Sequence, residues 1–360
     1  MAASKRPYHE QVDIENTKKL RELMDTLPSF TKDFFRGIEP VTASRTRIAY
    51  AYDLRVFFDF LLNNNSIWAS KGIQGIHLED LDRITLSDLE EYTEHLKYYD
   101  KDDEDHINKE RGIKRKLSSL KSFYNYYYRK EAIKTNPAAL IQLPKIHEKE
   151  IVRLEPDEVA RLLDEVESGS KLTKHQAAFH EKNKVRDLAM MTMLLGTGIG
   201  VSECVGLDLN DVDFENSGLR IHRKGGKEVV VYFGQEVYDA LVPYWEQRKL
   251  IVAEDGHENA LFLSGQNKRI SVRAVQNLVK KYSSTVTTLK NITPHKLRST
   301  YGTSLYRETG DIYLVADVLG HSDVNTTKKH YAAIEDERRR YAKDKVTLRE
   351  STPLHSPKES

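Results

Sequence analysis

The sequence VADVLGHSDVNTT spans Val315–Thr327, and Tyr331 follows it four residues later. Upstream, His295 and Arg298 lie three residues apart in the sequence HKLR, a spacing that places both side chains on one face of a helix. A guanidinium group can donate two parallel hydrogen bonds to a phosphate while it remains charged. A phenol can act as a nucleophile when cations stabilise its anion. Together these residues indicate attack on a phosphodiester, although His295 and Arg298 taken alone also fit a solvated helix surface.

The length and composition of the chain set wider limits. Its 360 residues suggest about two domains, and 39% hydrophobic with 31% charged residues are typical of a soluble globular protein. The single Cys204 excludes a disulfide framework and favours a reducing, cytoplasmic setting. We find no signal-peptide core and no apolar run long enough for a membrane span. The net charge of +1 is low for a nucleic-acid-binding protein, so its basic residues would have to gather on one surface.

The second half of the chain predicts a mixed α/β domain over residues 150–350. Two β-rich runs, Leu219–Arg223 and Glu228–Phe233, flank Lys224-Gly225-Gly226-Lys227 and predict a hairpin, with Ala260–Ser264 as a third short strand. Caps, proline positions and apolar spacing predict the helices. One helix is expected to begin at Glu155-Pro156. Four more are expected over Asn183–Leu195, Ser271–Tyr282, Thr293–Glu308 and Ile312–Leu319.

The first half, residues 1–147, predicts only helices. One is expected around Tyr50–Leu61, one after Thr85, and a third, rich in basic residues, over Arg111–Tyr127. The polar, aperiodic stretch Leu143–Glu150 is interpreted as an interdomain linker. The fold class is therefore multidomain: an all-α N-terminal domain, a mostly helical α/β domain with a small antiparallel sheet, and a disordered tail at 351–360.

Other chemistries fit the sequence poorly. The glycine-rich segment Gly196–Gly200 ends an apolar helix instead of following a strand, which argues against a dinucleotide site. His175 and His180 are five residues apart, off the helical register, and Cys204 has no partner cysteine, so a zinc site is not expected. The sequence contains no nucleotide-binding or metalloprotease motif. We therefore expect no cofactor and no metal.

The motifs HxxR, LGHSDVNTT and a tyrosine ten residues after His321 resemble, in order and spacing, the tyrosine recombinase family of phage-integrase and Xer proteins. The resemblance covers nearly the whole chain. Within the family, the long segment before Tyr50 and the Gln176–Asp187 region look most like the XerS type of some Gram-positive bacteria. The segment from Lys328 to Ala333 looks more like integrases of mobile elements.

The resemblance implies a role for each matching residue. Tyr331 would attack phosphorus and form a 3′-phosphotyrosyl link, and Lys224 would protonate the 5′-oxygen that leaves. His295 and Arg298 would position and neutralise the phosphate, and His321 would bond one of its oxygens. Lys224 also fits a solvated turn lysine, as Lys227 does.

The pattern breaks at one position. Family members read Gly-Thr-Gly, an apolar residue and then arginine, whereas this chain reads Gly196-Thr197-Gly198-Ile199-Gly200. The first catalytic arginine therefore aligns with Gly200, while the supporting Glu203 is present. Loss of one preorganised donor from such a site costs about 10²–10³ in rate. Arg186, fourteen residues earlier, is not expected to replace it.

The resemblance implies an enzyme that exchanges DNA strands at a specific site, for chromosome dimer resolution or for integration and excision of a mobile element. Its expected partner is duplex DNA, bound by a homotetramer, with no nucleotide and no membrane. The candidate phosphate contacts, which fit solvated helix faces about as well, are Arg45, Arg47, Arg111, Lys114, Arg115 and Lys121. The alternative is a catalytically inactive DNA-binding partner in a recombination synapse. A helical transcription regulator would leave Lys224, the HxxR motif, His321 and Tyr331 unexplained.

Overall fold

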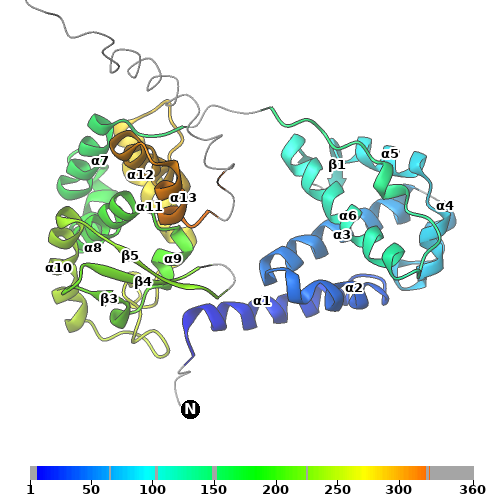
Figure 1. The fold of residues 1–360 in the computed structure, drawn as a ribbon, viewed down its shortest axis with the longest axis horizontal. Coiled ribbons are helices and arrows are strands. Elements are labelled where there is room, and N and C mark those ends of the chain that lie inside the picture. The colour runs from blue at the N-terminus through cyan, green and yellow to red at the C-terminus, as the bar shows by residue number, and fades with distance from the viewer. Residues whose placement is uncertain are drawn as a thin grey trace, which may run out of the picture. The chain divides into compact units, whose positions relative to one another are not determined.

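In the computed structural model the chain forms two compact units, Lys5–Lys149 and one that includes Glu150–Ser360 (Figure 1). The structure describes residues 6–64, 66–101, 104–147, 152–223, 226–321 and 324. The boundary between the two units falls inside the stretch that the sequence indicates as a linker. Within the described part of the chain, no helix combines the length and apolarity that a membrane crossing needs.

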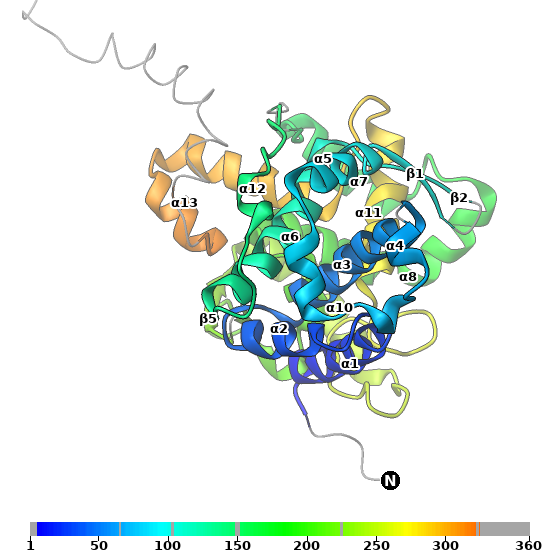
Figure 2. The same cartoon turned by 90° about the vertical axis from the view of Figure 1, so that its right-hand side faces the viewer.

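The N-terminal unit is built mainly from helices, which bury one apolar face each. Helices α3 and α6 pack against each other, and both views of the ribbon show them in this unit (Figures 1 and 2). The helices are α1 (Tyr8–Met24), α2 (Thr31–Ile38), α3 (Ser44–Asn64), α4 (Ser66–Ala69), α5 (Leu86–His95) and α6 (Glu110–Arg129). Thr85 caps α5 by accepting a hydrogen bond from the Asp88 amide, in agreement with the helix that the sequence predicts after Thr85.

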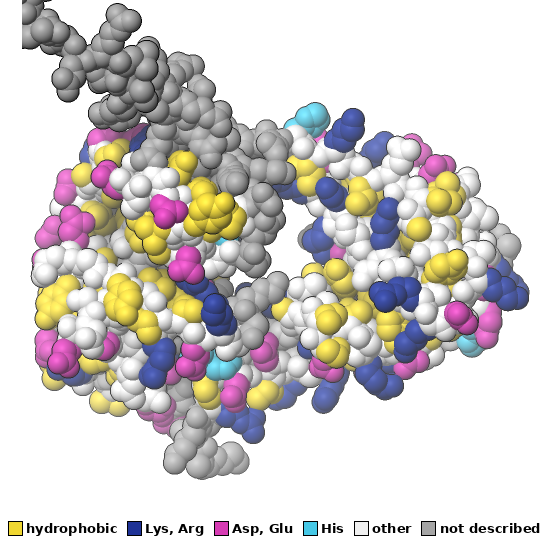
Figure 3. Space-filling model, viewed as in Figure 1, with side chains coloured by type: hydrophobic (Ala, Val, Ile, Leu, Met, Phe, Trp, Pro, Cys, Tyr) yellow, Lys and Arg dark blue, Asp and Glu magenta, His cyan; other side chains and the backbone are white. Residues whose placement is uncertain are grey.

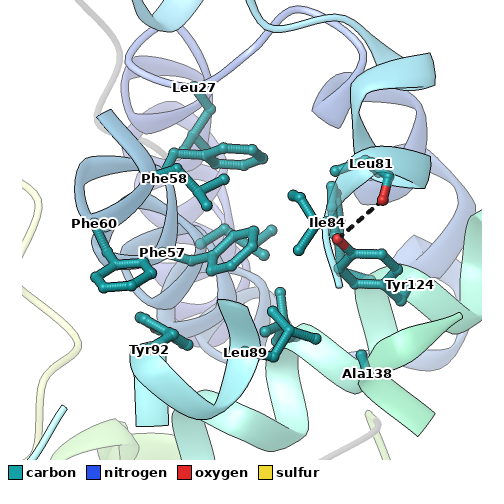
Figure 4. Packing of buried hydrophobic residues seen from close by; sticks show 14 of the residues in the cluster. Leu27, Phe57, Phe58, Phe60, Leu81, Ile84, Leu89, Tyr92, Tyr124 and Ala138 are labelled. Atoms are coloured by element: carbon teal, nitrogen blue, oxygen red, sulfur yellow. Dashed lines mark hydrogen bonds between the residues drawn. The ribbon is translucent and has the colours of Figure 1, made fainter. Parts of the chain in front are cut away.

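Aromatic side chains fill the centre of the N-terminal unit. Phe123 on α6 is fully buried, and its ring lies 5.2 Å from the ring centroids of both Phe34 and Tyr127. Figure 4 shows Phe57, Phe58, Leu89 and Tyr92 gathered in the same core. The Tyr124 hydroxyl donates to the Leu81 carbonyl at 3.5 Å, so this buried phenol keeps a polar partner (Figure 4). The buried tyrosines of α6, Tyr124 and Tyr127, therefore act in packing.

A short antiparallel hairpin interrupts the helices and was not predicted from the sequence. Strands β1 (Tyr98–Lys101) and β2 (Glu104–Ile107) pair with Tyr98 opposite Ile107. The Tyr99 ring lies between the imidazoles of His95 and His106, 5.1 Å from each. Its strands are only four residues long and strongly charged, so they lack the apolar alternation by which strands are recognised.

The C-terminal unit surrounds a small sheet with helices. The helices are α7 (Pro156–Ser168), α8 (Lys174–Thr197), α9 (Val201–Gly206), α10 (Gln235–Leu250), α11 (Val272–Val286), α12 (Pro294–Thr309) and α13 (Ile312–Leu319). The sheet has the order β3-β4-β5, with β3 (Val212–Asp213), β4 (Gly218–His222) and β5 (Glu228–Tyr232). The predicted hairpin is confirmed, with Gly218 opposite Tyr232 and His222 opposite Glu228.

The third strand lies elsewhere than predicted. The prediction of a strand at Ala260–Ser264 is wrong, because that segment makes only isolated bridges, between Ala260 and Asp208 and between Leu263 and Arg269. The strand that completes the sheet is β3, two residues long and too short to leave a pattern in the sequence. Ala260 to Leu263 are buried nonetheless, which explains their apolar character.

A buried polar network fixes α8 against α11. The Asp187 carboxylate, 1% exposed, accepts from Arg186 at 2.7 Å and from the Tyr282 hydroxyl at 2.9 Å. The same hydroxyl lies 2.9 Å from Nδ1 of His180. Burial, together with the nearby Asp187, raises the pKa of Tyr282 well above its usual range. Arg186 is thus committed to this network and to the Leu263 carbonyl, in agreement with the expectation that it does not serve the site.

Replacement of Phe123 by Ala should lower the free energy of unfolding of the N-terminal unit by about 3–5 kcal/mol, because a buried ring leaves a cavity. The chain has two tryptophans, one in each unit, so the fluorescence of Trp68 in a Trp245→Phe background follows this unit alone during denaturation in urea. Tyr128→Ala is the control, since Tyr128 on the same helix is 48% exposed and should cost under about 1 kcal/mol. Equal costs for the two variants would contradict this account of the core.

Candidate active site

Arg298 is the centre of the site that the structure describes. It lies on α12, whose start is set by Thr293 as N-cap and Pro294 as the first helical residue. Its Nη1 donates to the Gly198 carbonyl at 2.8 Å and to Oε2 of Glu203 at 3.5 Å. Its Nη2 donates to the Leu319 carbonyl at the end of α13. Arg298 therefore joins α12 to the loop after α8 and to the turn that carries His321.

The turn after α13 depends on a glycine. Gly320 has φ +65°, in the left-handed region that favours glycine, and ends the helix. The amide of His321 then donates to the Ala316 carbonyl at 2.8 Å, which fixes the first residue after the helix. Because Arg298 bonds Leu319, it lies next to this turn.

Gly200, at the position of the expected arginine, borders the same cluster. Its amide donates to Oε2 of Glu203 at 2.5 Å, and it is the N-cap of α9. Its dihedral angles, φ −71° and ψ 152°, are open to any residue. A Cβ atom built here would lie 3.2 Å from Oε2 of Glu203 and 3.9 Å from Nη1 of Arg298. A side chain at position 200 would therefore begin beside Arg298 and Glu203.

Arg223, which the sequence analysis did not single out, also belongs to the cluster. It follows β4 and directly precedes Lys224. Its Nη1 and Nη2 donate to the carbonyls of Asp317 and Val318, at 3.1 and 2.5 Å. Its Nε lies 3.9 Å from Oε1 of Glu203, within ion-pair distance. In the sequence an arginine beside a turn lysine looks like any solvated turn residue, so no local signal distinguishes it.

The electrostatics of the cluster favour an anion. Arg223, Arg298 and Glu203 are each at most 17% exposed in their side chains, so solvent screens them only in part. Two guanidinium groups against one carboxylate leave one surplus positive charge among these three residues. The neighbouring Cys204 is not a competing nucleophile, because burial raises the pKa of its thiol to about 12 and keeps it protonated.

The other candidate site residues have different positions. His295 is exposed in the first turn of α12, one turn before Arg298. His321 is half-buried at the end of the α13 turn. Lys224 and Tyr331 lie outside the described residues. The structure thus brings together Arg298, Glu203, Gly200 and the turn of His321, and the approach of Tyr331 stays a prediction.

The candidate DNA contacts divide into two groups. Arg45 and Arg111 are exposed, and Lys114 and Lys121 are half-buried. Arg47 is 9% exposed and bonds Glu39 at 2.6 Å, while Arg115 bonds the buried Asp53 at 2.5 Å. These two guanidinium groups balance carboxylates of the fold. On the face drawn in Figure 3, Lys and Arg side chains occur at many points of the N-terminal unit.

Comparison with known proteins assigns the class. Residues 152–338 match the phage integrase family, and residues 32–131 match the N-terminal SAM-like domain of phage integrases. The chain therefore belongs to the phage integrase family, the class of tyrosine recombinases. It is 32% identical to the tyrosine recombinase XerC of Caldanaerobacter subterraneus over 347 residues, covering 92% of each chain. It is 30% identical to XerD of Staphylococcus epidermidis over 294 residues, covering 82% of this chain and 90% of XerD.

Solved structures share the fold. A Tn1549 transposon integrase fragment in complex with circular intermediate DNA has a TM-score of 0.59 at 21% identity, over 83% of this chain and 93% of that one. XerH bound to a palindromic difH substrate has a TM-score of 0.61 at 17% identity, over 83% of this chain and 80% of that one. A helical N-terminal unit followed by a mostly helical unit with a small sheet is thus a recombinase fold.

Gly200 and Gly320 should respond oppositely to alanine. Gly200→Ala should stay within about 1 kcal/mol of the parent, because the backbone there is ordinary and a poorer N-cap is offset by a less flexible unfolded chain. Gly320→Ala should cost at least about 1–2 kcal/mol, since φ is positive and a Cβ would lie 2.3 Å from Nη1 of Arg223. Urea denaturation followed by Trp245 in a Trp68→Phe background measures both. A larger cost at Gly200 than at Gly320 would contradict the assigned backbone roles.

Proposed function

We propose that this chain is a site-specific tyrosine recombinase that binds duplex DNA and exchanges strands through a 3′-phosphotyrosyl intermediate. The observation that carries the proposal is the arrangement of Arg298 and Glu203 around position 200, beside the turn of His321. Membership of the family, with relatives matched over most of their length, supports the same reaction class. The retained motifs add Lys224 and Tyr331 from the sequence.

The reaction follows from the chemistry of these groups. The hydroxyl of Tyr331 attacks phosphorus, a bond forms to the 3′-phosphate, and the bond to the 5′-oxygen breaks. Lys224 gives a proton to that oxygen. A phenol has an ordinary pKa near 10, so neighbouring cations must stabilise its anion and the charge of the transition state. A 5′-hydroxyl from the partner strand then attacks the phosphotyrosine and releases the tyrosine. One phosphodiester is exchanged for another, and ATP is not required.

We propose that Gly200 impairs this reaction. In the family pattern, position 200 carries an arginine, which would add a third guanidinium group to those of Arg223 and Arg298. Glycine removes it and leaves the supporting Glu203 in place, hydrogen-bonded to the Gly200 amide. Loss of one preorganised donor lowers the rate by about 10²–10³. The chain then binds DNA and cleaves it slowly.

Gly200 also favours the second candidate function, a catalytically inactive DNA-binding partner in a recombination synapse. Such a protein keeps the DNA-binding surfaces and loses only the chemistry. Both functions share duplex DNA as the partner and a tetramer as the proposed assembly, acting in the cytoplasm. The biological role is chromosome dimer resolution or the integration and excision of a mobile element. Which of the two applies depends on the DNA site that the protein recombines.

Gly200→Arg should raise the rate of covalent complex formation by about 10²–10³ on a nicked suicide substrate. The substrate is a duplex nicked close to the 3′ side of the scissile phosphate, so the short fragment that carries the released 5′-hydroxyl diffuses away after cleavage. The protein–DNA link then accumulates and is counted on a denaturing gel. Gly200→Lys is the matched variant, with a charge but no planar fork, and should recover less. The unchanged chain cleaving as fast as Gly200→Arg would contradict the impairment.

The variant Tyr331→Phe, in the Gly200→Arg background, tests whether Tyr331 is the nucleophile. It should abolish the covalent complex while DNA binding remains, because only the hydroxyl is removed. A complex that persists would remove Tyr331 from the mechanism. A Gly200→Arg chain that binds DNA and never forms a complex would favour the inactive partner.

Neutralising Arg111 and Lys114 should weaken duplex binding by the same factor for every DNA sequence, because phosphate contacts do not depend on the bases. They lie three residues apart on α6, so the pair Arg111→Gln and Lys114→Gln should lower the slope of log affinity against log salt by about 2. Fluorescence anisotropy of a labelled duplex between about 50 and 200 mM salt measures it. Arg129→Gln, an exposed arginine at the other end of α6, is the control. An unchanged slope in the double variant would exclude this face.

A further inference from the structure

We propose that Arg223 is a positioning residue, which clamps the β4–β5 hairpin onto the end of α13 and thereby fixes the turn that carries His321. The inference rests on the proposed function and deepens it, because it assigns a role to a residue outside the matching motifs. Arg223 directly follows β4, whereas the turn is almost one hundred residues later in the chain.

The guanidinium is placed as a cap for α13. The last carbonyls of a helix have no partner inside it and carry the negative end of the helix dipole. Arg223 donates to two of these carbonyls, those of Asp317 and Val318, at 3.1 and 2.5 Å. The next carbonyl, of Leu319, accepts from Arg298. Two arginines from separate elements thus bind three successive carbonyls.

Gly320 permits the close approach. A Cβ at this position would lie 2.3 Å from Nη1 and 2.5 Å from Cζ of Arg223, so the guanidinium rests directly on the glycine backbone. The residue after Gly320 is His321, whose amide bonds back to Ala316. The guanidinium therefore lies beside the residue that directly precedes His321.

Glu203 connects Arg223 to the rest of the site. Its Oε1 lies 3.9 Å from Nε of Arg223, a buried atom that makes no hydrogen bond to a described residue, and its Oε2 accepts from Arg298 and from the Gly200 amide. One carboxylate thus contacts both arginines that bind the α13 carbonyls. Movement of Arg223 would remove one of the three groups that contact this carboxylate.

A residue that acts through His321 should matter only while His321 is present. The test is a double-mutant cycle of cleavage rate in the Gly200→Arg background, with Arg223→Met, His321→Ala and both together. Misplacement of a catalytic group by about 1 Å can cost 10²-fold. We expect Arg223→Met to slow covalent complex formation about 10–100-fold with His321, and less than about 3-fold without it. Arg223→Lys, which keeps the charge and loses the fork, should lie between.

The matched control is Arg220→Met. Arg220 lies on β4, the strand that Arg223 follows, and its guanidinium bonds Asp211 and the Asn210 carbonyl, at 3.1 Å each. It should leave the rate nearly unchanged in both backgrounds. Thermal unfolding followed by Trp245 checks that each variant is folded. An equal cost of Arg223→Met with and without His321 indicates a merely structural role and overturns the proposal, as does no cost in either.

A second measurement separates this inference from the proposed function. If no variant forms a covalent complex, the proposed reaction is contradicted. Hydrogen exchange then tests the role of Arg223 on its own. Arg223→Met should speed exchange of the Gly320 and His321 amides, which bond the Asp317 and Ala316 carbonyls. Arg220→Met should not. Unchanged exchange at both amides in Arg223→Met overturns the clamp.

Discussion

The end of helix α13 is held by two guanidinium groups that come from distant parts of the chain. A helix C-terminus leaves carbonyl oxygens without partners, and cations near it are stabilised. Arg223 and Arg298 supply these partners here, one from the sheet and one from α12. Because these carbonyls bind both arginines, the same contacts hold the turn of His321 and the groups that we propose to neutralise a phosphate.

Glu203 makes this assembly possible. Two arginines close together repel each other, and a shared carboxylate offsets that repulsion. Its Oε2 also accepts a hydrogen bond from the Gly200 amide, so the start of α9 is tied to the same cluster. The site therefore keeps its internal structure although glycine replaces the expected arginine. In the proposed mechanism, what is missing is one positive charge toward the phosphate, while the residues that would surround it are retained.

Much of the fold could be predicted from the sequence. Helix α13, the β4–β5 hairpin and the caps of α5 and α12 follow from local patterns, because each is set by neighbouring residues. The β1–β2 hairpin and β3 could not be predicted, since strands of two to four residues carry too little periodicity. The same holds for the site. The HxxR spacing is local, whereas the role of Arg223 depends on contacts with residues 317 and 318, which no short pattern records.

The backbone conformation at Gly200 determines how easily this position can accept another residue. A glycine that a turn requires is locked in, because every replacement strains the chain. Gly200 is not of that kind: its dihedral angles suit any residue, and the nearest obstacle is the flexible end of Glu203. The described backbone at position 200 would therefore accept an arginine, and a single codon change would introduce the residue that the family pattern carries.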